Sequence, residues 1–438
     1  MTDAPHARGS VPARHVAAVV IGNALEFYDF LTYAFFAVYI GRAFFPSSSP
    51  TASLLASLGT FAVGFVTRPI GGIVIGRMGD RAGRKPAMIL SFSLMGIAIT
   101  GLALTPSYAA IGGAAPVLVI LFRMVQGFAL GGEVGPTTAF LLEAAPLERR
   151  GFYTAFQAWT QDFSILISGL VGFGLANLLN ERQLQDYGWR IAFLLGAAIV
   201  PFGLMLRRSL PETFHAGEKG KRERVPLRPL LPVIIIGLLL LASATIGTYI
   251  SSYMTTYAIS TLGMHANVAF AATVVVGLCG VAFDLVSGAL SDRIGRKRMM
   301  IIPAVLLLAS ILPAFYIISH YRTTATLLGA TAVMATFASL STCPTIVWLT
   351  ESLPAAIRSG GLAIVYAFSI AIFGGSTQVS VTWLIKVTRN PLAPAWYWIV
   401  ALTVGLGAMI AANESAPRKI AKGAPKQAVP AQLPDEAV

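Results

Sequence analysis

The heptapeptide GDRAGRK at residues 79–85 returns as SDRIGRK at residues 291–297. The two copies are 212 residues apart. A second pair of sites repeats at nearly the same spacing, because Glu143 and Glu351, each followed by a proline and an arginine, are 208 residues apart. Two independent motifs at nearly one offset indicate that the chain consists of two halves with the same fold.

The segments between these motifs are strongly apolar. Of 438 residues, 55% are hydrophobic and 12% are charged, whereas soluble domains carry roughly 25% charged residues. Apolar windows of roughly 20 residues, enough to cross about 30 Å of hydrocarbon, recur from Val16–Ile40 to Trp396–Ala412. We therefore predict an all-α membrane protein with about twelve transmembrane helices in two pseudo-symmetric six-helix bundles.

The apolar pattern divides the chain into four parts. Residues 1–207 are predicted to form an N-terminal six-helix bundle, and residues 230–412 a C-terminal one. Residues 208–229 are polar, charged and punctuated by proline, which is typical of a cytoplasmic linker. Residues 413–438 are rich in Pro, Ala and Lys and are predicted to be a disordered cytoplasmic tail.

Topology explains the net charge of +13 better than nucleic-acid binding does. The Lys and Arg residues lie in short loops between spans rather than on one helix or patch, and they favour every second loop. The positive-inside rule then places both termini in the cytoplasm. Cys279 and Cys343 fall inside predicted spans, and the five histidines lack metal-ligand spacing, so neither a disulfide nor a metal site is expected.

The D-R-x-G-R-K loops, together with Pro211-Glu212-Thr213 after the sixth span, resemble the major facilitator superfamily. The resemblance implies alternating access between two rocking bundles, a bacterial-type cytoplasmic (inner) membrane and a monomer. Further motifs resemble its metabolite:proton symporter family, whose carriers take citrate and tricarballylate, 2-oxoglutarate, shikimate, and proline or betaine. These motifs are GNALEFYDF at 22–30, RPIGG at 68–72, RMVQG at 123–127, GGE at 131–133 and AIFGG at 371–375.

The first span carries two ionisable groups near its middle, although one such group costs roughly 2.5 to 3.5 kcal/mol on insertion scales. Glu26 and Asp29 follow helical spacing with Asn23 and Tyr33, so the four side chains lie on one stripe of the helix. We expect this stripe to face a central cavity, with Asn23 and Tyr33 in contact with substrate.

The fourth span carries Arg123, Gln126 and Glu133. A guanidinium group offers a bidentate fork and keeps its charge, so Arg123 is the leading candidate for binding a substrate carboxylate, with Gln126 beside it. In the alternative, Arg123 neutralises a buried carboxylate as a structural pair. Arg68 in the second span is either a second substrate cation or a partner for a neighbouring acid.

Several polar residues inside spans are candidates for proton coupling or substrate contact. The candidate proton carriers are Glu26, Asp29, Glu133 and Asp162, because the protonation of a buried carboxyl depends on the charge beside it. The other predicted substrate contacts are Gln157, Gln161, Tyr253, Ser369 and Gln378. Asp284 in the eighth span is predicted to belong to a structural pair.

The repeated loops lie just past the ends of spans. There a carboxylate can face the positive N-terminal end of a neighbouring helix and pair with an arginine. We expect Asp80 with Arg84, and Asp292 with Arg296, to hold the cytoplasmic side closed. The rest of the predicted gating network is Arg81, Glu143, Arg150, Arg293, Glu351 and Arg358. In the alternative, the basic residues only anchor the topology.

These features predict proton-coupled uptake of an organic anion, with citrate or a related tricarboxylate as the expected substrate. The alternatives are 2-oxoglutarate or another dicarboxylate, then proline or betaine, and a drug-efflux antiporter. An enzyme is not expected, because the sequence has no nucleotide-binding glycine loop, no H-E-x-x-H and no G-x-S-x-G. We expect no cofactor and no nucleic acid; the coupling ion is a proton, with sodium left open, and the remaining partners are the anion and the lipid bilayer.

Overall fold

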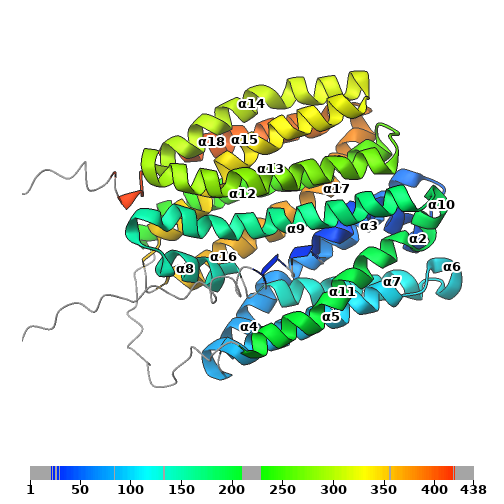
Figure 1. The fold of residues 1–438 in the computed structure, drawn as a ribbon, viewed down its shortest axis with the longest axis horizontal. Coiled ribbons are helices and arrows are strands. Elements are labelled where there is room, and N and C mark those ends of the chain that lie inside the picture. The colour runs from blue at the N-terminus through cyan, green and yellow to red at the C-terminus, as the bar shows by residue number, and fades with distance from the viewer. Residues whose placement is uncertain are drawn as a thin grey trace, which may run out of the picture.

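The computed structural model describes residues 21, 23–24, 27–28, 30–82, 84–131, 134–209, 228–354, 357–417 and 419. Some side chains inside the helices are not described, among them those of residues 79–82, 84 and 85. The described residues form long helices with short connections, and no strand occurs among them. Figure 1 shows these helices running side by side in two groups.

The N-terminal group contains six helical rods. The first is formed by the described residues between 21 and 44 and ends in α2 (Ala37–Phe44). The next five are α3 (Pro50–Val66) with α4 (Arg68–Ala82), α5 (Arg84–Leu104), α7 (Ala114–Leu130) with α8 (Val134–Ala144), α9 (Arg150–Leu178), and α11 (Trp189–Ser209). The short helices α6 (Tyr108–Ile111), η1 (Leu147–Arg149), α10 (Glu181–Gln183) and η2 (Leu184–Gly188) connect them.

The C-terminal group repeats this arrangement after η3 (Arg228–Leu230). Its rods are α12 (Leu231–Ser260), α13 (Ala266–Ile294), α14 (Arg296–Tyr321), α15 (Thr324–Ser352), α16 (Arg358–Ser369) continued by η4 (Ile370–Gly374) and α17 (Gly375–Thr388), and α18 (Ala393–Ala411). Most of the predicted linker, residues 210–227, lies outside the described residues.

Among the described residues, eight helices are long and apolar enough to cross a membrane, and two shorter apolar helices accompany them, Ile89–Leu104 and Ala114–Leu130. With the first rod and α11, these elements make two sets of six. The prediction of a twelve-helix membrane protein in two bundles is therefore confirmed. The chain is a multi-pass membrane protein.

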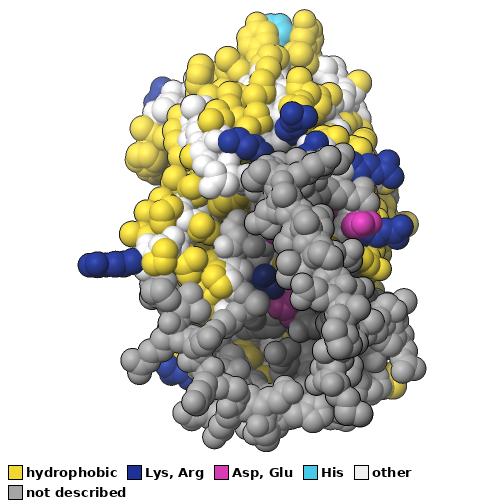
Figure 2. Space-filling model, turned by 90° about the vertical axis from the view of Figure 1, so that its left-hand side faces the viewer, with side chains coloured by type: hydrophobic (Ala, Val, Ile, Leu, Met, Phe, Trp, Pro, Cys, Tyr) yellow, Lys and Arg dark blue, Asp and Glu magenta, His cyan; other side chains and the backbone are white. Residues whose placement is uncertain are grey.

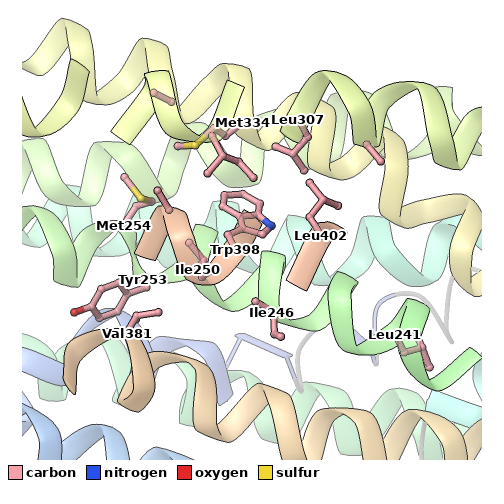
Figure 3. Close-up of a cluster of buried hydrophobic side chains, with 14 of the residues drawn as sticks. Leu241, Ile246, Ile250, Tyr253, Met254, Leu307, Met334, Val381, Trp398 and Leu402 are labelled. Carbon is pink, nitrogen blue, oxygen red and sulfur yellow. The ribbon is translucent and has the colours of Figure 1, made fainter. Parts of the chain in front are cut away.

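The C-terminal bundle has a tightly packed apolar centre. Trp398 of α18 lies there among Ile250 and Met254 of α12, Met334 of α15, and Leu402 of α18 itself (Figure 3). In lipid, where tails are as apolar as the side chains, such close packing is a main source of helix association. This centre lies inside one bundle, so it holds that bundle together as a unit.

The glycine of the second repeated motif makes the turn from α13 into α14. Gly295 has φ +105°, a conformation that strains any residue with a Cβ atom. Its counterpart in the first half, Gly83, lies outside the described residues. The requirement for this turn explains why the motif keeps a glycine between its two charged parts.

The two bundles meet along α9 and α13, which Figure 1 shows directly side by side. The helices are antiparallel and approach closely where glycines leave room. Gly151 of α9 packs on Gly288 of α13 at one end, and Gly277 of α13 packs on the backbone of Leu166 nearer the middle. Small residues allow such close approach of helices in membranes. This contact positions the candidate site.

Candidate functional site

A cavity of about 110 Å³, lined by both polar and apolar residues, lies between the two bundles. Its walls come from the first rod and α9 of the N-terminal bundle, and from α12, α13, α15 and α16 of the C-terminal bundle. Its polar lining residues are Gln157, Gln161, Asp162, Thr245, Thr248, Tyr249, Ser251, Asp284, Ser339, Thr342 and Tyr366. A cavity at the interface of repeats is where transporters of this construction bind substrate.

Two arginines lie on one aromatic ring next to this cavity. The Cζ atoms of Arg68 and Arg123 are 4.2 Å and 4.3 Å from the ring centroid of Phe30. Arg123 also contacts the rings of Tyr33 and Phe61, at 4.5 Å and 4.9 Å. Aromatic faces attract cations, and more strongly where water is excluded. These rings therefore hold both guanidinium groups inside the protein.

Both guanidinium groups keep unused hydrogen-bond donors. Nε and Nη2 of Arg68 and of Arg123 have no hydrogen-bond partner among the described residues. Nη1 of Arg123 donates to Oε1 of Gln126 at 2.6 Å. No described carboxylate forms an ion pair with either arginine. Buried cations with free donors favour an anion, because an unpaired buried charge is costly.

The two arginines differ in their access to the cavity. Arg68 lines a neighbouring void of about 10 Å³, room for about one water molecule. Phe27 and Tyr366 line both this void and the main cavity, so they form the wall between Arg68 and the cavity. Arg123 lines neither space and is fully buried. The predicted substrate cation is thus covered in this conformation.

Three predicted proton carriers, Glu26, Asp29 and Glu133, lie outside the described residues. The fourth, Asp162, lines the cavity together with Asp284. Asp284 was expected only in a structural pair and is buried at 1% exposure. The roles of all these acids stay predictions.

The predicted polar contacts of α9 do reach the cavity. Gln157 lines it with both amide atoms unpaired among the described residues. Gln161 lines it too and donates to the hydroxyl of Tyr366 at 3.3 Å. Tyr366 was not predicted, because tyrosines inside spans usually serve packing and carry no sequence mark of cavity exposure.

Asn23 and Tyr33, expected on the cavity wall, instead contact helices of their own bundle. Asn23 is 2% exposed and donates to the hydroxyl of Thr160 on α9. Tyr33 donates to the backbone carbonyl of Ser57 at 3.3 Å. Neither lines the cavity. Among the described residues of the first rod, Phe27 and Leu31 line the cavity.

The second-half candidates also lie off the cavity. Tyr253 hydrogen-bonds to Thr382 at 2.8 Å, which joins α12 to α17. Ser369 donates to the carbonyl of Leu238 at 3.4 Å, and Gln378 donates to the carbonyl of Tyr249 at 3.3 Å. These contacts hold α12 against the rod formed by α16, η4 and α17. Tyr249 of α12, held by one of them, lines the cavity.

The second repeated loop forms a buried cluster of charges. Nη2 of Arg296 lies 2.7 Å from Oδ1 of Asp292 and 3.1 Å from Oε1 of Glu351. We call these three residues the cytoplasmic charge cluster, after the side on which the positive-inside rule is expected to place them. Asp292 also accepts hydrogen bonds from the backbone N–H groups of Gly151 and Phe152, at 2.9 Å and 3.0 Å. The carboxylate thus meets the positive end of α9 in the other bundle, the geometry expected from the sequence.

The remaining gating candidates surround this cluster. Nη1 of Arg358 lies 3.4 Å from Oε1 of Glu143, an ion pair between the bundles. Nε of Arg150 has no partner among the described residues, and Arg293 is exposed. The side chains of Asp80, Arg81 and Arg84 lie outside the described residues. A role in gating stays a prediction for the whole set. Figure 2, which looks onto this end of the molecule, shows Lys and Arg side chains spread over it.

The start of the predicted disordered tail packs against the same cluster. The side chain of Glu414 accepts hydrogen bonds from the backbone N–H groups of Arg296 and Lys297, at 2.8 Å and 3.3 Å. Ser415 donates to Glu351 at 2.7 Å. A carboxylate at the first turn of α14 satisfies N–H groups that have no partner inside the helix. The first residues after α18 therefore belong to the folded bundle.

Two repeated six-helix bundles with a cavity between them have the architecture of an alternating-access transporter. Among the described residues, no group of three or more His, Cys, Asp or Glu side chains is placed to hold a metal. The family model of the Major Facilitator Superfamily matches residues 19–369. The chain belongs to this superfamily. This membership confirms the prediction of a transporter rather than an enzyme.

Relatives with known roles are similar over almost the whole chain. The citrate-proton symporter of Klebsiella pneumoniae is 36% identical over 89% of each chain. The alpha-ketoglutarate permease of Escherichia coli (strain K12) is 34% identical over 87% of this chain and 88% of its own length. The proline/betaine transporter of Salmonella typhimurium is 31% identical, over 93% of this chain and 85% of its own.

The fold also matches solved structures. The crystal structure of a D-xylose-proton symporter superposes with a TM-score of 0.74, covering 92% of this chain and 98% of that one. The two sequences are only 20% identical. This likeness supports the two-bundle fold.

Proposed function

We propose that the protein takes up an organic anion together with protons, by alternating access, and that the anion is citrate or a related tricarboxylate. The observation that carries the proposal is the pair of buried guanidinium groups on Phe30, which lie behind the cavity wall and keep donors without a partner among the described residues. Two planar cationic forks suit a ligand with several carboxylates. The similarity to citrate-proton symporters supports the same substrate class.

In this proposal Arg123 and Arg68 bind the carboxylates, with Gln157 and Gln161 orienting the substrate. The aromatic wall of Phe27 and Tyr366 separates Arg68 from the cavity, so substrate entry requires these rings to move. The cytoplasmic charge cluster holds one end of the α9–α13 contact closed until they do. The membrane is the bacterial-type inner membrane, with both termini in the cytoplasm.

A dicarboxylate such as 2-oxoglutarate is the second candidate. It is favoured by the similarity to the alpha-ketoglutarate permease, and it needs the same arginines. Proline and betaine carry one carboxylate beside a cationic nitrogen, so two cations on one ring fit them less well.

Uptake of labelled citrate into proteoliposomes tests the proposal. The vesicles receive an imposed pH gradient, with sodium replaced by choline in one arm. Unlabelled tricarballylate, 2-oxoglutarate, shikimate and betaine serve as competitors. We expect gradient-driven uptake without sodium, inhibited most strongly by tricarballylate. Inhibition by betaine alone, or uptake that requires sodium, would contradict the assignment.

A further inference from the structure

Asp162 and Asp284 meet at the contact between the two bundles. Asp162 belongs to α9 and Asp284 to α13, and both line the central cavity. Their carboxyl groups are close enough to hydrogen-bond to each other. At about 1.5 Å per residue, Asp162 lies roughly 18 Å from the start of α9 and Asp284 roughly 15 Å from the end of α13. The pair therefore lies near the middle of the membrane.

The pair is buried, and no described cation forms an ion pair with it. Asp284 is 1% exposed, and its Oδ2 atom has no hydrogen-bond partner among the described residues. The titratable groups that face the pair are the thiols Cys279 of α13 and Cys343 of α15, and the cavity tyrosines Tyr249 of α12 and Tyr366 of α16. No described basic side chain pairs with either carboxyl.

The backbone of α13 leaves space for this arrangement. A Cβ atom at Gly280 would overlap the carboxyl group of Asp162. The helices are equally close one turn further along, where Gly277 packs on Leu166. The carboxyl of Asp162 thus occupies a slot on the partner helix that only a glycine provides.

Two carboxylates this close in a buried site do not both ionise, because the repulsion of two negative charges shielded from water exceeds the cost of keeping one proton. We propose that Asp162 and Asp284 share one proton across the interface and form a proton-binding site of the transporter. The proton is bonded to one carboxyl oxygen and hydrogen-bonded to the other. This inference rests on the proposed proton-coupled function.

Release of the proton has a mechanical consequence. The O–H bond breaks, the proton passes to water in the cavity, and two carboxylates remain on facing helices. Their repulsion acts directly on the α9–α13 contact and favours separation of the bundles. Protonation therefore stabilises the packed contact, and deprotonation favours the conformation in which the two helices part.

Infrared difference spectroscopy on the full-length protein tests the shared proton without any substrate. At neutral pH we expect a C=O stretch of a protonated carboxyl group that is absent from Asp162→Asn and from Asp284→Asn. Asp186→Asn is the control, because Asp186 is 61% exposed. A band that persists in both single variants would overturn the inference.

Transport in proteoliposomes tests the coupling. In each single variant, the ratio of gradient-driven citrate accumulation to citrate counterflow should fall at least 10-fold, and the double variant should match the singles. A ratio equal to wild type overturns the inference. If the wild-type protein does not transport citrate, the proposed substrate is wrong. The infrared measurement still tests whether Asp162 and Asp284 share a proton.

Gly280→Ala provides an independent variant that keeps both aspartates. Its methyl group overlaps the carboxyl of Asp162, so it should also remove the protonated-carboxyl band. Gly174→Ala on α9 is the matched control, because nothing lies within 4 Å of the added Cβ atom. An unchanged band in Gly280→Ala would count against a proton shared through this slot.

Discussion

Arg68 and Arg123 place their guanidinium groups on the same ring, at 4.2 Å and 4.3 Å from the centroid of Phe30. Like charges this close are held together at a cost, and the attraction to the ring offsets only part of it. An anion bound to both guanidinium groups would offset the remaining repulsion between them. Since no described carboxylate pairs with either arginine, the proposed function predicts that binding of a multivalent carboxylate stabilises this arrangement.

Replacing either arginine by lysine should weaken citrate binding at least 10-fold, about 1.4 kcal/mol. Lysine keeps the charge but loses the planar fork and the stacking on Phe30. The measurement is the dissociation constant of citrate for purified Arg68→Lys and Arg123→Lys. Arg190→Lys is the matched control, since Arg190 also stacks on an aromatic ring, that of Trp189 at 4.3 Å, away from the cavity. Wild-type affinity in both test variants would show that the two arginines have a structural role and do not bind citrate.

Arg296→Ala should destabilise the protein by about 3 kcal/mol, because it leaves two buried carboxylates, Asp292 and Glu351, without their cation. Thermal unfolding in detergent measures the effect. Arg182→Ala is the control: its ion pair with Asp186 is 91% and 61% exposed and should contribute less than about 1 kcal/mol. Equal effects of the two substitutions would show that the buried cluster carries no special stability.

Asp292→Asn should open the cytoplasmic side, because the carboxylate both pairs with Arg296 and accepts from the N–H groups of Gly151 and Phe152. A cysteine placed at the cavity residue Thr245 reports the opening through its labelling rate by a water-soluble maleimide. We expect several-fold faster labelling from the cytoplasmic side. An unchanged labelling rate would indicate that the charge cluster only anchors the membrane topology and does not hold the cytoplasmic side closed.

Much of this architecture is predictable from sequence. Hydropathy and the repeated heptapeptide predict two bundles, and the carboxylate near a span end predicts contact with the N-terminal end of a neighbouring helix, without saying which helix. The pairing of Asp162 with Asp284 is not predictable in this way. It depends on which faces of α9 and α13 meet, and the close packing at Gly277 and Gly280 that decides this involves residues far apart in the chain.

The burial of Arg123 beneath the rings of Phe30, Tyr33 and Phe61 cannot be predicted from the sequence, for a similar reason. Helical spacing places Asn23 and Tyr33 on one stripe, but spacing alone does not say whether that stripe faces the cavity or a neighbouring helix. Tyr33 packs against Arg123 and Phe61, and Asn23 donates to Thr160, so these two side chains face helices of their own bundle. A periodic pattern defines a face of a helix, whereas the volumes of the neighbouring side chains define its partner.

Gly295→Ala should destabilise the protein by about 1–3 kcal/mol, the range for a residue forced into a strained backbone conformation. The added Cβ atom would strain the turn at φ +105° and would collide with the side chain of Glu414. Gly329→Ala is the matched control, because nothing lies within 4 Å of its Cβ position inside α15. There the substitution should be neutral or stabilising, by up to about 1 kcal/mol. If both variants unfold at the same temperature, the turn does not require its glycine.

Two truncations test whether the first residues of the tail, which pack on the bundle, stabilise the protein while the later residues do not. A stop after Lys419 keeps Asn413, whose carbonyl accepts from the indole of Trp348 at 2.6 Å, and keeps Glu414 on the first turn of α14. A stop after Ala412 removes both contacts and leaves the N–H groups of α14 without the carboxylate. The loss of such a helix-end interaction is worth about 1 kcal/mol. The shorter protein should therefore unfold at a lower temperature in detergent, while the longer one keeps the wild-type midpoint. Identical midpoints for the two truncations would show that Glu414 contributes nothing to holding the cytoplasmic charge cluster in place.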